Sequence, residues 1–165
     1  MNIEADQLSL TDLVKNPVLF LAFGFGSGLA PKAPGTFGTL AAIPIYLLAS
    51  LGDPAIYGVV LTATLIAGIF ICDKASEMLG VHDHAGIVWD EIAGFLVTMM
   101  AVPFSWPAVV IGFVLFRLFD IWKPWPIGAI DKHVKGGFGI MLDDVIAGIF
   151  ALVCISALQN SMMLF

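Results

Sequence analysis

The sequence has little charge for a chain of 165 residues. Aspartate, glutamate, lysine and arginine together make up 12% of it, whereas hydrophobic residues make up 59%, and the mean hydropathy is +0.98. Soluble domains carry roughly a quarter of their residues as charged side chains, because these cover the surface in contact with water. The shortage of charge argues against a soluble protein and predicts that most of the outer surface faces lipid.

Basic residues and cysteines are scarce as well. The net charge is −6, which provides none of the basic surface that nucleic-acid binding needs. The two cysteines, Cys72 and Cys154, stand in apolar runs without metal-ligand spacing, so no disulfide is expected. Residues 1–16 lack the basic start and apolar stretch of a secretory signal. We expect a polar N-terminal segment over residues 1–16 and a single transmembrane catalytic domain over residues 17–165.

Long uncharged runs are what the sequence has instead. Residues 92–116 and 145–165 carry no charge, and residues 33–72 carry only Asp53. A helix needs about 20 mostly apolar residues to cross a membrane, and turn-forming residues around Asp53 and Ser105 divide these runs. The predicted spans are residues 35–51, 55–72, 87–102, 108–122 and 142–158, with polar loops at 73–86 and 123–141.

The expected fold class is an all-α integral membrane protein, a compact bundle of four to five transmembrane helices. Residues 17–30 are apolar but broken by glycines, so a glycine-rich half-helix or re-entrant segment is expected there. A short surface helix is expected at residues 9–14. The lysines all fall on one face of this bundle, and basic loops face the cytoplasm. Most acidic residues and the histidines gather at the same predicted cytoplasmic face.

Two acidic pairs, Asp90-Glu91 and Asp143-Asp144, each begin a predicted helix that enters the membrane from this face. One interpretation is structural, since carboxylates at a helix N-terminus interact favourably with the helix dipole. That interpretation does not extend to Asp120, which ends a span where the dipole disfavours negative charge. Converging carboxylates repel one another unless a cation joins them, and ligands that are all oxygen suit Mg²⁺. These residues therefore favour a metal site.

The glycine-rich segment 24–39 leads into the first predicted span and contains Lys32. Its glycines would let backbone N–H groups approach an anion, and the helix that follows presents its positive end. Hydroxyl groups from Ser27, Thr36 and Thr39 add hydrogen-bond donors. The alternative is close packing between membrane helices, which small residues also permit. The carboxylates nearby favour phosphate binding.

Two further groups complete the charged face. The run His82-Asp83-His84 has no additional histidine or cysteine at zinc spacing, so it is either a solvated loop or a hydrogen-bonding, acid–base element. Arg117 and Asp120 share one helix face and can pair with each other, although the arginine fork also suits phosphate. Neither cysteine is followed by an arginine in a phosphate-binding loop, and there is no Asp-x-Asp-x-Thr run.

Taken together, these motifs resemble the bacterial phosphatidylglycerophosphatase A family. The residues that carry the resemblance are 24–39, 81–94, 117–126 and 136–148. The resemblance implies a multi-pass enzyme of the bacterial inner (cytoplasmic) membrane with its active site facing the cytoplasm. It also implies Mg²⁺ dependence and the hydrolysis of the anionic phospholipid phosphatidylglycerophosphate to phosphatidylglycerol and inorganic phosphate.

Roles for individual residues follow as expectations from the motifs and the resemblance. The expected catalytic residues are Asp90, Glu91, Asp120, Asp143, Asp144 and His84. The expected phosphate-binding residues are Ser27, Lys32, Gly35, Thr36, Thr39, Arg117 and Lys123. The expected Mg²⁺ ligands are Asp90, Glu91, Asp143 and Asp144.

Two other classes of protein compete with this interpretation. A small transporter or channel for an anionic substrate could use the same glycines and lysines, but its inverted repeats and midplane sites are not evident in the sequence. A purely structural membrane subunit leaves the one-sided charge unexplained.

Overall fold

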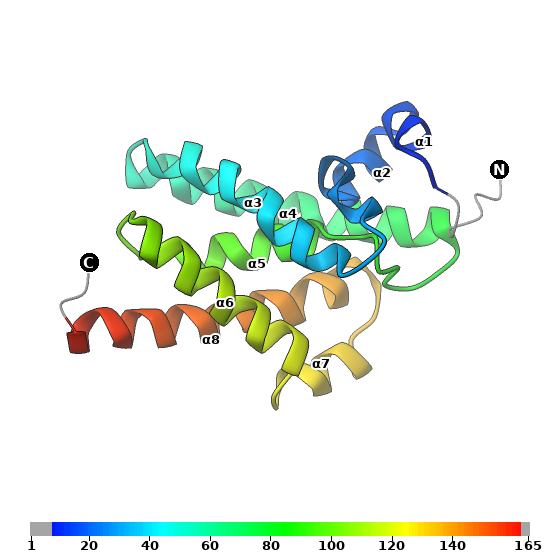
Figure 1. Ribbon diagram of the computed structural model, residues 1–165. Coiled ribbons are helices and arrows are strands. Elements are labelled where there is room, and N and C mark those ends of the chain that lie inside the picture. The colour runs from blue at the N-terminus through cyan, green and yellow to red at the C-terminus, as the bar shows by residue number, and fades with distance from the viewer. Residues whose placement is uncertain (1–7, 163–165) are drawn as a thin grey trace.

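The computed structural model describes residues 8–162 of the chain, with side chains described as far as residue 159. Within that range every regular element is helical, which confirms the all-α expectation (Figure 1). The elements in chain order are α1 (Leu10–Lys15), α2 (Pro17–Ala22), the 3₁₀ segment η2 (Gly24–Leu29), α3 (Pro34–Ser50), α4 (Pro54–Leu79), α5 (Trp89–Met99), α6 (Trp106–Trp122), α7 (Ile127–His133) and α8 (Gly136–Met162).

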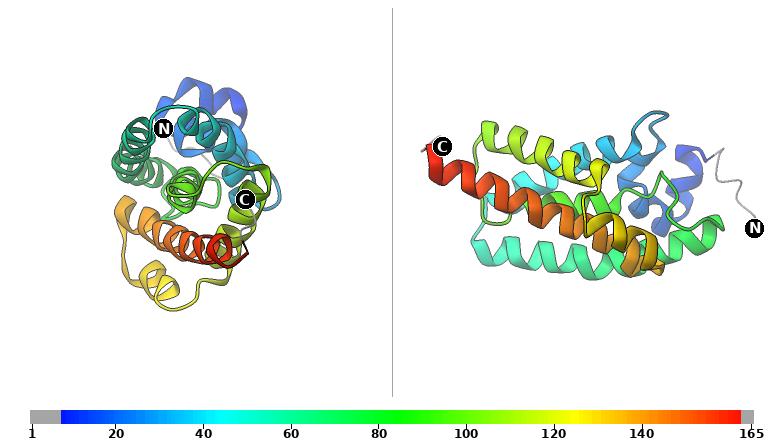
Figure 2. Two further views of the ribbon diagram at one scale, coloured as in Figure 1. Left: turned by 90° about the vertical axis from the view of Figure 1, so that its left-hand side faces the viewer. Right: turned by 90° about the horizontal axis from the view of Figure 1, so that it is seen from below.

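Helix α5 forms the centre of the bundle. It packs against α3, α4, α6 and α8, and the end-on view shows it enclosed by its neighbours (Figure 2). Every residue of α5 except Glu91 is buried. The outer helices instead have both buried and exposed apolar side chains. Phe70 of α4 and Val153 of α8 are examples of the exposed ones. A helix that is hydrophobic on all sides suits a core position, so α5 is the element around which the others pack.

The two predicted tight turns are present and have clear chemical causes. Asp53 caps α4, its carboxylate accepting a hydrogen bond from the Ala55 N–H at 2.8 Å, and Pro54 occupies the first turn. Ser105 caps α6 in the same way through the Ala108 N–H at 3.2 Å. Such capping residues satisfy N–H groups that have no partner within the helix, so these residues fix where each hairpin turns.

The predicted loop boundaries are wrong at two places. Residues 73–79 belong to α4, which ends only at Gly80, a left-handed C-cap with φ of 67°. The residues involved are good helix formers, and Lys74 pairs with Glu77 at 2.7 Å, so the loss of apolarity does not end the helix. The second predicted loop, 123–141, contains α7 and the start of α8, which begins six residues before the predicted Leu142.

The first turn of α8 is held by one residue near the end of α4 and by one residue in the loop that follows it. The Asp73 carboxylate accepts a hydrogen bond from the Gly137 N–H at 2.8 Å, and His82 Nε2 accepts one from the Gly136 N–H at 3.1 Å. Asp73 and His82 therefore satisfy helix N–H groups, which explains why α8 begins at Gly136.

The N-terminal region packs beside α4 at one end of the bundle (Figure 1). The expected surface helix is confirmed as α1, which Ser9 caps through a capping box with Asp12. Residues 17–30 form the short α2 and the irregular η2, where Phe25 and Gly26 have φ of 60° and 99°. The predicted break in helical structure is therefore present, and a membrane half-helix or re-entrant segment stays a prediction. The predicted segments 1–16 and 17–165 also contain residues 1–7 and 163–165, which lie outside the described residues.

Two helices among the described residues are long and apolar enough to cross a membrane, Pro54–Leu79 and Gly136–Gln159. Helix α3 is apolar but has only 17 residues. This composition is compatible with a membrane protein. The number of four to five spans stays a prediction.

Candidate active site

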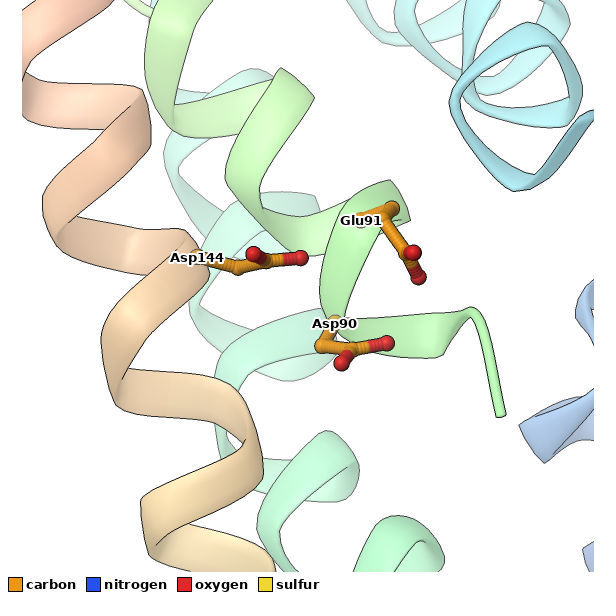
Figure 3. A group of neighbouring side chains, drawn as sticks. All are labelled: Asp90, Glu91 and Asp144. Carbon is orange, nitrogen blue, oxygen red and sulfur yellow. The ribbon is translucent and has the colours of Figure 1, made fainter. Parts of the chain in front are cut away.

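Three carboxylates meet where α5 begins. Asp90 and Glu91 lie in the first turn of α5, and Asp144 comes from α8 (Figure 3). One oxygen from each carboxylate lies within 4.8 Å of one from each of the others. Residues more than fifty positions apart in the sequence thus form one acidic cluster.

A close crossing of α5 and α8 brings these carboxylates together. A Cβ atom at Gly94 would lie 2.8 Å from the Asp144 carbonyl oxygen, and one at Gly148 would overlap the Gly94 carbonyl. The Thr98 hydroxyl, also at the crossing, donates to the Gly94 carbonyl at 3.0 Å. Small residues allow two helix backbones to approach this closely. In each helix a glycine follows the acidic pair, Gly94 in α5 and Gly148 in α8, so the glycines serve helix packing and bring the carboxylates together.

The acidic cluster is buried and short of partners. Asp90 is 7% exposed and Asp144 is 3% exposed. Asp90 Oδ1, Glu91 Oε2 and Asp144 Oδ2 are buried without a hydrogen-bond partner among the described residues. Buried charges are costly unless they are paired or coordinate a metal. The cluster is therefore incomplete without a cation or protons.

Helix α6 supplies the cationic side of the site. Arg117 Nη1 lies 2.5 Å from Asp120 Oδ2 and 3.7 Å from Glu91 Oε1, although neither Nη1 nor Nε has hydrogen-bond geometry to a partner within the described part of the chain. A Cβ at Gly35 would overlap Glu91 Oε1 and lie about 3 Å from the guanidinium. Only glycine at this position lets the start of α3 come so close to the ion pair.

Lys123 lies beyond the end of α6 and joins two carboxylates. Its Nζ lies 2.7 Å from Asp143 Oδ2 and 2.9 Å from Asp131 Oδ1. Burial alone would lower the pKa of Lys123, but the hydrogen bonds with Asp143 and Asp131 prevail and raise this pKa above its ordinary value. The ammonium group is therefore charged throughout the physiological pH range.

These groups line one cavity of about 360 Å³, here called the acidic cavity. Helices α3 and α5 both begin at it, so their positive ends lie there together with Arg117 and Lys123. The lining residues are Ala33, Pro34, Gly35, Asp83, Ala85, Ile87, Asp90, Glu91, Arg117, Asp120, Ile121, Lys123, Asp143 and Asp144. A cavity that combines carboxylates with fixed cations can hold a metal ion and an anionic group side by side.

Most of the predicted site residues are brought together here. The acidic cavity is lined by all five predicted catalytic carboxylates and by Gly35, Arg117 and Lys123. Asp143 lies outside the three-carboxylate cluster, because its carboxylate pairs with Lys123.

The other predicted residues lie elsewhere. His84 lines a neighbouring cavity. Lys32 is exposed, and Thr36 lies in the first turn of α3 but does not line the acidic cavity. The Thr39 hydroxyl is buried and donates to the Gly35 carbonyl at 2.9 Å, and the Ser27 hydroxyl faces the Phe23 carbonyl. Hydroxyls of Ser27 and Thr39 therefore satisfy their own backbone.

Two charged residues of the site were not among the predicted site residues. Asp83 lines the acidic cavity and has a φ of 53°. Its position in the polar run His82-Asp83-His84 was the sequence signal that could have identified it. Asp131 holds Lys123 from α7. Nothing in the sequence distinguishes Asp131 from a solvated loop residue, because α7 itself was not predicted.

An all-α chain with buried carboxylates and fixed cations around one cavity is suited to phosphate-ester chemistry, and comparison with known proteins places it among the phosphoric monoester hydrolases. The family model described as Phosphatidylglycerophosphatase A matches residues 20–159. The chain belongs to the phosphatidylglycerophosphatase A family.

Individual relatives agree with this assignment. The Phosphatidylglycerophosphatase A of Escherichia coli is 47% identical over 84% of this chain and 81% of that protein. The Haemophilus influenzae protein of the same name is 44% identical over 90% of this chain and 92% of its own length. A Bacteroides thetaiotaomicron protein named "Putative phosphatidylinositol-3-phosphatase" is 38% identical over 85% of this chain and 91% of its own length. No solved structure matches the chain.

Proposed function

We propose that this chain is a Mg²⁺-dependent enzyme that hydrolyses phosphatidylglycerophosphate to phosphatidylglycerol and inorganic phosphate at the cytoplasmic face of the bacterial inner membrane. Membership of the family supports the phosphatase activity and implies the lipid substrate. The observation that carries the proposal is the meeting of Asp90, Glu91 and Asp144 with Arg117 in one cavity.

The donor atoms of the cluster fit Mg²⁺. All are carboxylate oxygens, and Asp90, Glu91 and Asp144 each have a buried oxygen without a partner, as a cation site requires. These three residues would hold the ion, whereas Asp143 is engaged by Lys123. When bound, Mg²⁺ supplies charge neutralisation of the phosphoryl oxygens and a more acidic water.

The two basic residues of the acidic cavity, Arg117 and Lys123, bind and orient the phosphate. Arg117 is held in place by Asp120 and by Glu91, and its unsatisfied donors suit the phosphoryl oxygens. Lys123 supplies a second fixed cation. In the reaction a water oxygen bonds to phosphorus, the bond from phosphorus to the headgroup oxygen breaks, and the alcohol leaves with a proton. Fixed cations stabilise the charge that builds up on the phosphoryl oxygens during this exchange.

The membrane arrangement supports access to a lipid headgroup. We propose four to five spans, built from α3, α4, α6 and α8 around α5, with the acidic cavity on the side that carries the lysines. Basic loops favour the cytoplasm. The names of the relatives describe phosphatases of phosphatidyl lipids, two for phosphatidylglycerophosphate and one for a phosphorylated inositol lipid, so a phosphate monoester on a polyol headgroup is the substrate class we propose.

The test is phosphate release from phosphatidylglycerophosphate in mixed detergent micelles by the purified full-length chain. We expect release with Mg²⁺ and at least a hundredfold less after chelation by EDTA, with recovery when Mg²⁺ is restored. Release that is insensitive to EDTA would contradict the metal, and no release under either condition would contradict the activity and favour the alternative of an anion transporter.

A further inference from the structure

A second cavity of about 350 Å³ adjoins the acidic cavity and has no role in the mechanism above. Pro34 and Ala85 line both cavities, so the two share a wall. The second cavity, here called the loop cavity, is built from the irregular chain of η2 and from the segment before α5. Besides these two residues, its lining includes Phe23, Gly28, Ala30, Pro31, His84 and Gly86.

His84 is the polar side chain of the loop cavity, and its ring is fixed. His84 Nδ1 accepts a hydrogen bond from the Gly86 N–H at 3.0 Å, and the ring packs on Phe23 with centroids 5.7 Å apart. Because Nδ1 is an acceptor, the proton of the neutral ring is assigned to Nε2. Nε2 has no hydrogen-bond partner among the described residues, so it is a free donor on an oriented ring.

Backbone geometry also maintains this cavity. A Cβ at Gly86 would overlap the Phe23 ring, and one at Gly28 would overlap the Gly86 carbonyl. The two glycines therefore allow η2 to lie directly against the segment that carries His84. The glycine-rich sequence shapes this cavity as well as the start of α3.

Lys32 adds a positive charge at the boundary between the two cavities. Its neighbour Pro31 lines the loop cavity, and its other neighbour Ala33 lines the acidic cavity. Lys32 is exposed and forms no ion pair with any described residue. A cation at this position is available to an anionic group that extends from one cavity into the other.

We propose that the loop cavity binds the phosphodiester and glycerol part of the substrate, while the acidic cavity holds the phosphate monoester that is hydrolysed. This inference rests on the proposed function and adds the residues that recognise the headgroup. The two phosphates of such a lipid are separated by one glycerol unit, which suits two cavities that share a wall. His84 Nε2 donates to an oxygen of the phosphodiester or glycerol, and Lys32 offsets the charge of the phosphodiester.

Inhibition by the two reaction products separates the cavities experimentally. Inorganic phosphate probes the acidic cavity alone, whereas phosphatidylglycerol carries the phosphodiester and glycerol but no monoester. For His84→Ala and Lys32→Ala we expect KM for phosphatidylglycerophosphate and the inhibition constant of phosphatidylglycerol each to rise about tenfold. The inhibition constant of inorganic phosphate and kcat should stay within about twofold of wild type.

A steric variant and two matched controls complete the design. Ala30→Phe narrows the loop cavity without adding to the lining of the acidic cavity, and it should reproduce the effect of His84→Ala. His133→Ala and Lys135→Ala change exposed residues of the same types that line neither cavity, and both should behave as wild type.

Two results would overturn the inference. Unchanged inhibition by phosphatidylglycerol in His84→Ala, Lys32→Ala and Ala30→Phe would show that the headgroup binds elsewhere. A tenfold loss of kcat with unchanged KM in His84→Ala would place His84 in the chemical step instead. Failure of the proposed function is distinguishable, because the wild-type protein would then release no phosphate at all.

Discussion

Unpartnered carboxylate oxygens mark the candidate active site at the scale of single residues. Asp53 uses its carboxylate as a helix cap and Asp73 uses its own to hold α8, so both are satisfied by the backbone. Asp90 and Asp144 each keep a buried oxygen that has no hydrogen-bond partner in residues 8–159. A buried group of this kind destabilises the fold unless a ligand completes it, which is why these two carboxylates are the ones to alter.

We expect Asp90→Asn and Asp144→Asn each to lower kcat for phosphate release by at least a hundredfold and to raise the Mg²⁺ concentration needed for half-maximal rate. The physical reason is that an amide offers the ion one neutral oxygen where a carboxylate offers a charge. The measurement is phosphate release over a Mg²⁺ titration, with thermal unfolding in detergent followed in parallel.

Glu77→Gln provides the control for these two variants. Glu77 is an exposed acidic residue that pairs with Lys74 and does not line the acidic cavity, so the rate and Mg²⁺ dependence of this variant should match wild type. Wild-type rates in both aspartate variants would remove the carboxylate cluster from the mechanism.

The residue types of the site could be predicted from the sequence, but their individual uses could not. Asp90, Asp120 and Asp144 stand out because charge within or beside apolar runs is costly. Ser27 and Thr39 looked equally suitable for phosphate, yet their hydroxyls face backbone carbonyls. A hydroxyl near a helix start has this local partner available, and only the folded geometry decides between the two uses.

At the scale of elements, the crossing of α5 and α8 determines whether the site forms. Gly94 and Gly148 let the two backbones meet directly below the acidic pairs. The separation of Asp144 from Asp90 and Glu91 is therefore fixed by helix packing.

Gly148→Ala tests this dependence. Its Cβ would overlap the Gly94 carbonyl, so we expect the helices to separate, the protein to lose about 1–3 kcal/mol of stability, and phosphate release to fall at least tenfold. Thermal unfolding in detergent and the rate assay measure the two effects. Gly58→Ala is the matched control, because a Cβ there meets nothing within 4 Å. Equal behaviour of the two variants would contradict a tight crossing.

The sequence predicted the tight turns of the hairpins better than it predicted the ends of the helices. The turns at Asp53 and Ser105 were predictable because capping residues and prolines are local signals. The extension of α4 to Leu79 was missed because a helix that leaves an apolar environment continues until a C-cap such as Gly80 ends it. Helix α7 was missed because its seven residues pack on α8 through tertiary contacts that no local pattern reveals.

At the scale of the whole molecule, most charged residues gather toward the end of the bundle that holds the acidic cavity, and Asp53 lies in a turn at the other end. The turns before α4 and after α5 meet at the opposite end, where Gly52, Pro54 and Met100 line a common cavity. The acidic cavity therefore lies at one end of the bundle, and the opposite end is formed by the turns that connect the helices. This polarity was predictable from the lysines and carboxylates, whereas the loop cavity was not, because it depends on the irregular backbone of η2.

Cysteine labelling tests the polarity in the membrane. In a background with Cys72→Ala and Cys154→Ala, we expect Gly52→Cys to react with a membrane-impermeant maleimide in intact spheroplasts. Lys135→Cys should react only after permeabilisation, because basic segments remain in the cytoplasm. Reaction of both cysteines from the same side would contradict a bundle that spans the membrane between them.

The shortness of α5 has a consequence for which phosphate esters reach the carboxylates. Helix α4 has 26 residues and α5 has 11, which correspond to about 39 Å and about 16 Å at 1.5 Å per residue. Both adjoin the same closed end, where Pro54 and Met99 line one cavity, so the start of α5 is recessed far below the opposite end of α4. In the membrane arrangement proposed above, with a hydrocarbon core about 30 Å thick, a phosphate would have to descend from the water phase to meet Asp90. Depth would then discriminate between substrates, since an ester anchored by acyl chains is already held at the membrane, whereas a soluble metabolite would have to give up its hydration to arrive there.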